Sequence, residues 1–313
     1  MNLSIIIPIY NETLNLNKLY DRLLSVLEPL KLSFELVFIN DGSKDNSIQI
    51  IRTFSQKDNR VKFIHFSRNF GHQIAVQAGL DLCVGEAAII IDADLQDPPE
   101  LIVYLYKKYK EGFEVVYAKR RSRKGESYFK KLTAKMFYRL LSKITSIDIP
   151  VDTGDFRIID RQVINVLKEM PEQNKYLRGQ ISWLGFNQTF VEYDRDERYA
   201  GETGYTFRKM FRLAMDGITS FSNLPLKFAS ITGFVVSGIS FIVMLYALYS
   251  NFVLKRAVEG WTSIMISVLF LGGVQLICLG IIGEYISRLN QNVRNRPLYI
   301  IQQTNIEKTP SNS

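Results

Sequence analysis

Two aspartates, Asp92 and Asp94, follow a run of apolar residues in the stretch IIIDADLQDPPE at 89–100. Alternate side chains of an extended chain point the same way, so both carboxylates are expected on one face, followed by Gln96 if the chain stays extended. Like charges this close cost stability unless a cation or hydrogen-bond donors compensate. All the ligand atoms on offer are oxygens, which suit a hard divalent ion such as Mg²⁺ or Mn²⁺ that keeps positions open for substrate phosphates. A lone pair of this kind is more often a solvated acidic turn before a helix, so the surrounding elements must decide.

The elements that would position this pair alternate along the first 120 residues. Apolar runs predict strands at 3–9, 34–40, 61–66, 87–92 and 113–118. Helical spacing of apolar residues predicts helices at 14–28, 46–56, 72–83 and 99–111. This alternation is typical of parallel βαβ units, so we expect an α/β fold with a doubly wound, mostly parallel sheet.

Polar clusters follow four of the expected strands: PIYNE, NDGSKD, SRNFGH and DADLQD. Ligands of such sheets bind beyond the carboxyl ends of the strands, so these clusters are expected to meet in one site. No GxGxxG follows the first strand and no GxxxxGK[ST] occurs. A dinucleotide-binding dehydrogenase and a P-loop NTPase are therefore disfavoured, and a different nucleotide-binding sheet is expected.

Two long stretches carry no charged residue, Phe228 to Leu254 and Gly260 to Gly283. Each exceeds the roughly 20 residues that span a bilayer core, which predicts two transmembrane helices; the alternative is a pair of buried helices in a soluble protein. Basic residues flank the two stretches on their outer sides and outnumber those of the loop between them. By the positive-inside rule we expect both ends of the chain in the cytoplasm, at the cell membrane. The N-terminus lacks a basic region and its apolar run is cut by Pro8, so it is not expected to be a signal peptide.

The formal net charge of +8 would permit nucleic-acid binding, but no aromatic-and-basic recognition motif occurs. Because basic residues gather beside the apolar stretches, anionic lipid headgroups are the expected partner, and no nucleic acid is expected. Helical spacing at 126–146 and 205–221 indicates amphipathic helices that could lie on the membrane surface. The polar tail after Gln302 is expected to fray.

Six motifs occur in order: IIIPIYNE, FINDGSKDNS, SRNFGH, IIIDADLQDPPE, TGDFRIIDR and the C-terminal LGIIGEYISRLNQNVRNRPLYII. With them the chain resembles the polyisoprenyl-phosphate glycosyltransferases, relatives of dolichol-phosphate mannose synthase in the inverting GT-A class (family 2). The stretches AGET and GITSFSNLPLK make it most similar to the bactoprenol glucosyltransferases. The resemblance covers nearly the whole chain.

This resemblance implies four parts: a cytosolic GT-A domain at 1–204, amphipathic juxtamembrane helices at 205–227, two transmembrane helices at 228–287 and a cytosolic tail at 288–313. It implies transfer of a sugar to undecaprenyl or another polyprenyl phosphate with inversion, giving a lipid-linked donor for cell-envelope glycosylation. UDP-glucose is the favoured nucleotide sugar, followed by UDP-galactose or another UDP-sugar and then GDP-mannose. The implied cofactor is Mg²⁺ or Mn²⁺, and a homo-oligomer is left open.

The resemblance also implies roles for individual residues. Those expected against the base and ribose of the donor are Pro8, Tyr10, Glu12, Ile39 and Asp41. Those expected at the ribose and diphosphate are Asp92, Ala93 and Asp94, with Asp94 and Gln96 holding the metal. Those expected at the donor phosphates are Arg120 and Arg198. The family usually has a lysine where this sequence has Gly204, so a phosphate contact is missing there unless Arg208 or Lys209 supplies it.

Asp155 in TGDFR matches the position of the family's catalytic base. A phosphate monoester has a second pKa near ~6 and is largely dianionic at neutral pH, so removing a proton from the acceptor should contribute little. We therefore expect Asp155 mainly to orient the acceptor side, together with Arg157, or to hold a cation there. Arg123 is a further candidate for the acceptor phosphate. His72 is interpreted as a polar residue that opens a helix.

Other functions fit the residues less well. A processive polysaccharide synthase shares IIIPIYNE and DAD but carries a QxxRW motif, which QISWLG at 180–185 does not match. A non-catalytic nucleotide-sugar or lipid binder would not be expected to keep all the acidic site residues. A transporter is disfavoured because the two apolar stretches offer no intramembrane polar path.

Overall fold

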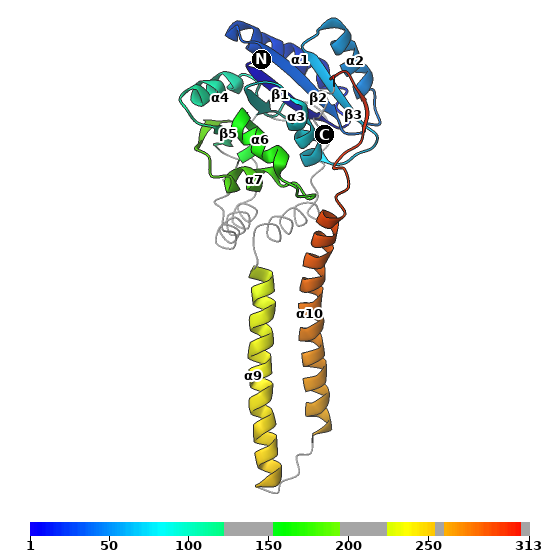
Figure 1. The fold of residues 1–313 in the computed structure, drawn as a ribbon, viewed down its shortest axis with the longest axis vertical. Helices are drawn as coiled ribbons and strands as arrows, with labels where there is room; N and C mark the ends of the chain where they lie inside the picture. Colours follow the sequence, from blue (N-terminus) through cyan, green and yellow to red (C-terminus); the bar gives the residue numbers. More distant parts are fainter. Residues whose placement is uncertain (122–152, 195–223, 254–259, 308–313) are drawn as a thin grey trace. The chain divides into compact units, whose positions relative to one another are not determined.

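The computed structural model describes residues 1–121, 153–194, 224–253 and 260–307, which belong to two compact units (Figure 1). The first, the sheet unit, contains the strands and the helices that cover them, and it includes the chain from Arg296 onward. The second, the helix pair, contains α9 (Leu224–Phe252) and α10 (Trp261–Val293). The stretches expected to be amphipathic helices, and the site candidates Arg123 and Arg198, lie outside the described residues.

The sheet unit is built on one sheet with the strand order β7-β5-β6-β4-β1-β2-β3-β8. Its strands are β1 (Leu3–Ile9), β2 (Phe34–Asn40), β3 (Val61–Phe66), β4 (Ala87–Ile90), β5 (Val115–Arg120), β6 (Thr153–Asp160), β7 (Gln188–Tyr193) and β8 (Ile301–Thr304). Strand β6 runs antiparallel to β4 and β5, and β8 runs antiparallel to β3, whereas the other pairings are parallel. The prediction of a doubly wound, mostly parallel sheet is confirmed.

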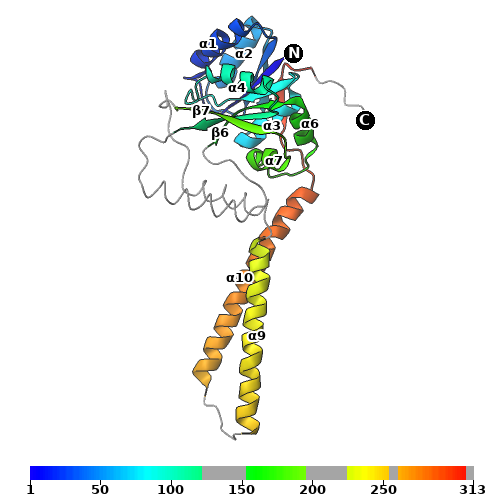
Figure 2. The same ribbon diagram turned by 90° about the vertical axis from the view of Figure 1, so that its left-hand side faces the viewer.

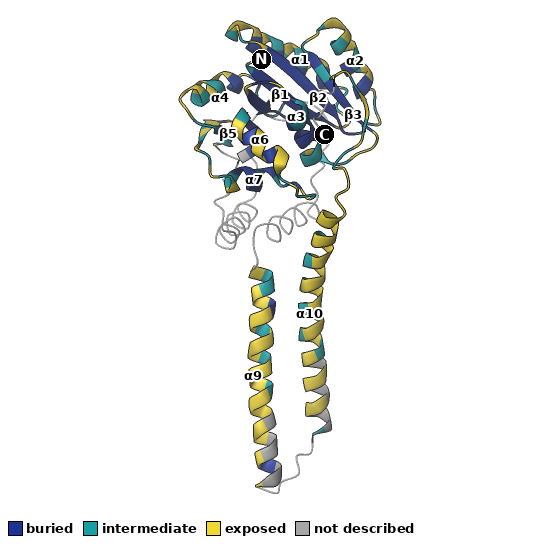
Figure 3. Cartoon of the chain, viewed as in Figure 1, coloured by how far each residue is buried: buried dark blue, intermediate teal, exposed yellow. Residues whose placement is uncertain are grey.

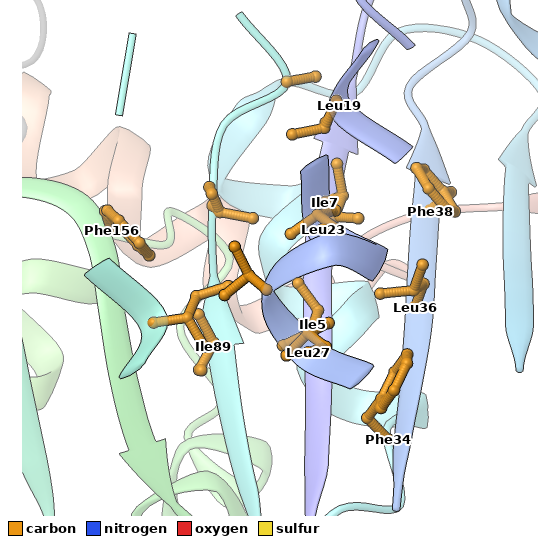
Figure 4. Close-up of a cluster of buried hydrophobic side chains, with 14 of the residues drawn as sticks. Ile5, Ile7, Leu19, Leu23, Leu27, Phe34, Leu36, Phe38, Ile89 and Phe156 are labelled. Carbon is orange, nitrogen blue, oxygen red and sulfur yellow. The ribbon is translucent and has the colours of Figure 1, made fainter. Parts of the chain in front are cut away.

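Helices cover both faces of the sheet, as the side view in Figure 2 shows. They are α1 (Leu16–Leu27), η1 (Glu28–Leu30), α2 (Ser47–Lys57), α3 (His72–Leu82), α4 (Leu101–Lys110), α6 (Arg161–Glu169) and α7 (Leu177–Trp183). One apolar core joins α1, α2 and α4 to one face of the sheet (Figure 4), and a second core joins α3, α6 and α7 to the other. Both faces of the central strands are thus buried, and every residue of β1 and β2 is buried instead of every second one.

The first three strands match the predicted strands residue for residue, and the predicted helices over the same part of the chain agree to within one or two residues at most ends. The predicted strand 87–92 is wrong at its end, because β4 stops at Ile90. The prediction for 113–118 is displaced, since β5 covers Val115–Arg120. Strands β6, β7 and β8 were not predicted, because their partners lie far away along the chain.

The helices of the helix pair are long and apolar enough to cross a membrane by length and composition. The most apolar stretch of α9 is Leu224–Val243, with a mean hydropathy of 1.8, and that of α10 is Phe270–Val293, with a mean hydropathy of 1.6. Most of their described side chains are exposed (Figure 3), including Phe234, which is 81% exposed. A buried helix pair of a soluble protein would instead hide such side chains.

The segment after α10 is ordered, so the prediction of a frayed tail after Gln302 is wrong for the residues that follow directly. Tyr299 stacks on Phe66 of β3 with 5.2 Å between ring centroids. Asn305 accepts a hydrogen bond from the backbone N–H of Phe63 at 2.7 Å and donates one to the carbonyl of Val61 at 3.0 Å. Polar side chains that replace strand partners in this way stabilise the edge, and a composition argument does not detect them.

The variant Asn305→Ala should accelerate amide hydrogen exchange in β3. It leaves the Phe63 N–H and the Val61 carbonyl without their partner, which should lower the stability of this edge by about 1–3 kcal/mol. Exchange measured by mass spectrometry on the detergent-solubilised chain tests this, with Gln302→Ala, an exposed position of β8, as control. Equal exchange of β3 in the two variants would contradict the role of Asn305.

Candidate functional site

The expected polar clusters meet at the carboxyl ends of β1, β2, β3 and β4. Strand β6 joins them because it runs antiparallel to β4, with Arg157 opposite Ile90. Its first residues therefore lie beside the segment that leaves β4. This topology brings Asp155 next to Asp92, although 62 residues separate them in the sequence.

Asp92 and Asp94 of the DADLQD cluster are presented by a turn and not by an extended strand. After β4 ends, the side chain of Asp94 accepts a hydrogen bond from the backbone N–H of Gln96 at 3.1 Å. Leu95 between them has a φ of 59°, in the left-handed region that is costly for a bulky side chain. Its side chain is buried in the first core, which stabilises the turn. The extended run that was expected to carry the alternation on to Gln96 does not continue, because β4 ends at Ile90 and the chain turns at Leu95.

Asp92 is a carboxylate that a nearby cation would stabilise. Its Oδ1 atom is buried and has no hydrogen-bond partner among the described residues. Burial raises the pKa of Asp92 to about 6, and the nearby carboxylates of Asp155, Asp97 and Asp94 also raise this pKa, while His72 opposes the increase. A group of like charges with an unsatisfied oxygen is an environment that a divalent cation would stabilise.

The side chains of Asp94 and Gln96 fit such a cation. Both offer oxygen ligands, and Asp94 is only 7% exposed. Within the described ranges, no group of three His, Cys, Asp or Glu side chains is arranged to hold a metal. A hard cation here would draw its other ligands from substrate phosphates and water, as Mg²⁺ commonly does.

Asp155 is surrounded by donors from three elements. Its Oδ1 accepts from Arg178 Nε of α7 at 2.9 Å and lies 3.4 Å from Arg157 Nη2 of β6. Its Oδ2 lies 3.1 Å from His72 Nε2 and 3.3 Å from Gln73 Nε2, both at the start of α3. Burial acts to raise the pKa of Asp155, but Arg178, His72 and Arg157 hold it well below its usual range. This carboxylate is therefore ionised and occupied on both oxygens.

His72 connects Asp155 to the DADLQD turn. Its Nε2 lies 3.1 Å from Asp155 Oδ2 and 3.6 Å from Asp92 Oδ1. Burial acts to lower the pKa of His72, yet the two carboxylates raise it to about 9, so the imidazole is charged at neutral pH. Neither His72 nor Arg178 was among the predicted site residues. The place of His72 directly after SRNFG was an available signal, whereas Arg178 lies in no motif.

Asp41 fastens the loop that carries His72. Its two carboxylate oxygens accept hydrogen bonds from the backbone N–H groups of Phe70 at 2.6 Å and Gly71 at 2.9 Å. Burial raises the pKa of Asp41, and these two hydrogen bonds oppose the increase. The next residue, Gly42, has a φ of 64°, and a Cβ there would lie 2.4 Å from the backbone of Arg68. The close approach of the two loops thus requires glycine.

The residues expected at the nucleotide lie at the ends of β1 and β2. Tyr10 is 44% exposed, and Glu12 lines a hollow of about 380 Å³ together with residues of the loop before α2. Pro8 pairs with Ile39 across the two strands, and the side chain of Ile39 is fully buried in the second core. Ile39 can therefore offer only its backbone to a ligand. Ala93 lies beside the aspartates and is buried.

Arg120 is held at the end of β5 by a second buried carboxylate. Its Nε donates to the Tyr193 hydroxyl at 3.3 Å, its Nη2 lies 3.8 Å from Asp97 Oδ1, and Tyr193 in turn donates to Asp97. Gly154 leaves room for the guanidinium, because a Cβ there would lie 3.0 Å from Arg120 Nη2. Since Asp97 belongs to the DADLQD turn, Arg120 is anchored beside the two aspartates.

The chain is similar to known proteins over both units. Residues 4–167 match the model of glycosyl transferase family 2, and residues 224–289 match that of the GtrB C-terminal hairpin. An uncharacterized glycosyltransferase of Bacillus subtilis, YkcC, is 54% identical, with 96% of this chain and 93% of that protein covered. The bactoprenol glucosyl transferase of Shigella phage SfII is 41% identical, with 97% and 98% covered.

Solved structures are more distant. The S. aureus TarS fragment in complex with UDP-GlcNAc has a TM-score of 0.45 and 17% identity, with 92% of this chain and 81% of that chain covered. The two family models and the relatives at 41–54% identity decide the classification. The chain belongs to glycosyl transferase family 2, with a GT-A type sheet followed by a helix hairpin of the GtrB kind.

Proposed function

We propose that the protein transfers glucose from UDP-glucose to a polyprenyl phosphate, such as undecaprenyl phosphate, with inversion at the sugar. The observation that carries the proposal is the similarity to proteins named bactoprenol glucosyl transferase, which extends over both the sheet unit and the helix pair. The product would serve as a lipid-linked glucose donor for glycosylation of the cell envelope.

The donor is proposed to lie along the carboxyl ends of β1, β2 and β4. Its base and ribose would contact the segment around Tyr10 and Glu12, and its diphosphate would face the DADLQD turn. Arg120, anchored by Asp97, is within reach of the same turn and would bind a donor phosphate. A divalent ion held by Asp94 and Gln96 would neutralise the charge that grows on the leaving diphosphate.

The reaction is a displacement at the anomeric carbon. A phosphate oxygen of the acceptor forms the new bond to this carbon, the bond to the donor diphosphate breaks, and UDP leaves with the bonding electron pair. The acceptor is already largely dianionic at neutral pH, so no strong base is required. The protein must bring two anions together. Cations that are already held in place before the substrates bind lower the repulsion between them.

The helix pair is proposed to anchor the enzyme in the cell membrane, with both chain ends in the cytoplasm. The described apolar side chains of α9 and α10 are mostly exposed and suit a lipid environment (Figure 3). A lipid acceptor whose chain stays in the bilayer and whose phosphate lies among the headgroups suits an enzyme anchored in this way.

Membranes that contain the protein should transfer label from UDP-glucose to undecaprenyl phosphate. A panel of labelled UDP-glucose, UDP-galactose, UDP-N-acetylglucosamine and GDP-mannose is assayed by extraction of label into the lipid phase. Chelation by EDTA should abolish transfer, and added Mg²⁺ or Mn²⁺ should restore it. Preferred labelling from another donor would reject glucose, and labelling that survives EDTA would reject the metal.

The variant Asp94→Ala should lower kcat by about 100-fold or more, because the charge on the departing diphosphate loses its compensation. The rate is measured with purified enzyme at saturating donor, acceptor and Mn²⁺. Asp21→Ala, which removes an exposed carboxylate of α1, is the control and should keep the wild-type rate. Full activity of Asp94→Ala would contradict its assignment.

The variant Asp155→Asn should lower kcat/KM for the acceptor by about 10- to 100-fold at every pH between 6 and 9, because the amide holds the surrounding cations less firmly. The pKa of Asp155 is depressed, so this residue stays ionised over the whole interval and should add no limb to the pH profile. On the acidic side, the wild-type profile should fall where the acceptor phosphate gains its proton, near ~6. Recovery of the variant at high pH would instead assign Asp155 as a base.

A further inference from the structure

We propose that His72 and Arg178 bind the phosphate of the lipid acceptor and that Asp155 is the positioning residue that holds these two cations in place. The inference rests on the proposed function and adds to it two residues that had no assigned role in the site. It also gives Asp155 a task that requires it to remain ionised throughout the reaction.

The two cations are held on different oxygens of one carboxylate. Arg178 Nε donates to Asp155 Oδ1 at 2.9 Å, and His72 Nε2 lies 3.1 Å from Asp155 Oδ2. The side-chain amide of Gln73 adds a contact from Nε2 to Asp155 Oδ2 at 3.3 Å, and its Oε1 accepts a hydrogen bond from the backbone N–H of Leu177 at 3.2 Å. Because Gln73 links the start of α3 to the start of α7, the spacing between His72 and Arg178 is fixed before any substrate arrives.

The charged side chains lie in layers of increasing exposure. The side chain of Arg157 is 2% exposed and that of Asp155 is 14% exposed, whereas those of Arg178 and His72 are 27% and 41% exposed. Solvent, and therefore an incoming anion, reaches Arg178 and His72 first. Arg157, which was predicted to lie at the acceptor phosphate, is more deeply buried than Asp155 and contacts its Oδ1 from the interior of the sheet unit.

The position of this cation pair favours the acceptor over the donor. His72 also faces Asp92, 3.6 Å away, so the pair borders the turn proposed to hold the donor diphosphate. The donor phosphates have their own compensation in Arg120 and in the ion at Asp94 and Gln96. A second anion that approaches the same carbon needs separate cations on the opposite side, and the start of α3 adds its favourable dipole there.

The charges around Asp155 leave room for a further anion. His72, Arg157 and Arg178 are three cations, and the two carboxylates that they contact are Asp92 and Asp155. His72 carries its charge at neutral pH, since the carboxylates raise its pKa to about 9. An acceptor phosphate has several oxygens and can contact both cations at once. The planar guanidinium of Arg178 is more preorganised for such a contact than a lysine ammonium on a flexible chain.

The test separates binding of the two substrates. Purified full-length enzyme is assayed with UDP-glucose and a short-chain isoprenyl phosphate, and equilibrium binding of the isoprenyl phosphate alone is measured in the same detergent. Arg178→Ala and His72→Gln should each raise the acceptor KM and the dissociation constant by about 10- to 100-fold, the loss expected for one charge-assisted hydrogen bond. The donor KM should stay within about twofold, and Arg178→Lys should recover part of the loss.

Arg22→Ala is the matched control. Arg22 is 28% exposed in its side chain and pairs with the Glu100 carboxylate at 2.6 Å, so it resembles Arg178 in exposure and in partner but lies on α1. Its acceptor KM and binding should equal those of the wild type. Thermal unfolding of every variant identifies those that lose structure. If Arg178→Ala does not fold, Arg178→Lys and His72→Gln still test whether these two cations bind the acceptor.

The outcomes distinguish this inference from the proposed function. If the wild type binds isoprenyl phosphate through His72 and Arg178 but transfers no glucose, the donor is wrong and the acceptor site stands. A rise of the donor KM with an unchanged acceptor KM would place the cation pair at the sugar nucleotide and overturn the inference. Wild-type affinity for isoprenyl phosphate in both variants, or no binding by the wild type, would overturn it as well.

Discussion

Compensation of negative charge at the ends of the strands is the constraint on which the rest of the sheet unit depends. Asp92, Asp94, Asp97 and Asp155 influence one another closely enough that Asp92 has a pKa raised to about 6. Two like charges about 4 Å apart repel by roughly 4 kcal/mol at a dielectric of ~20, a cost comparable with a large part of a domain's stability. Such a cluster persists only if cations and donors are built around it.

The surrounding elements supply these cations from distant parts of the chain. Arg120 on β5 compensates Asp97, while His72 on α3 and Arg178 on α7 compensate Asp155. Asp41 then fastens the loop before α3 through two backbone N–H groups. Removing one partner from a buried ion pair is far more costly than removing both, so each of these contacts fixes the geometry of the next. Catalytic geometry and stability of the sheet unit are for this reason hard to separate by single substitutions.

The sequence allowed prediction of the parts of the fold that depend on local periodicity. The strands Leu3–Ile9, Phe34–Asn40 and Val61–Phe66 were predicted at their observed bounds because each is a short segment rich in apolar residues between turn residues. Strand β6, which carries Asp155, was missed because its apolar run is interrupted by Arg157, whose side chain is fully buried. A buried arginine in a strand makes sense only once its partner from another element is known.

For the site as well, residues within a local motif were predicted, and residues that depend on packing were not. The aspartates of the DADLQD cluster were found from their place after an apolar run, but the turn before Gln96 was not predicted, because the left-handed φ of Leu95 cannot be inferred from spacing. Arg178 was missed because its distance of 2.9 Å from Asp155 depends on how α7 packs against the second core. The resemblance to a family supplied a role for Asp155, whereas only the structure showed that both its oxygens are already occupied.

The charge cluster also sets the pH interval in which the site keeps its arrangement. Asp155 has a depressed pKa, so its contribution to stability is present above its unfolded pKa of 3.8 and is lost as the pH falls further. His72 has a raised pKa, so its contribution is complete below 6.5 and is lost as the pH rises toward about 9. An acceptor phosphate gains its second charge only above ~6. Ionised Asp155, charged His72 and a dianionic acceptor therefore coexist around neutral pH, the condition under which a site built on charge compensation needs no proton transfer.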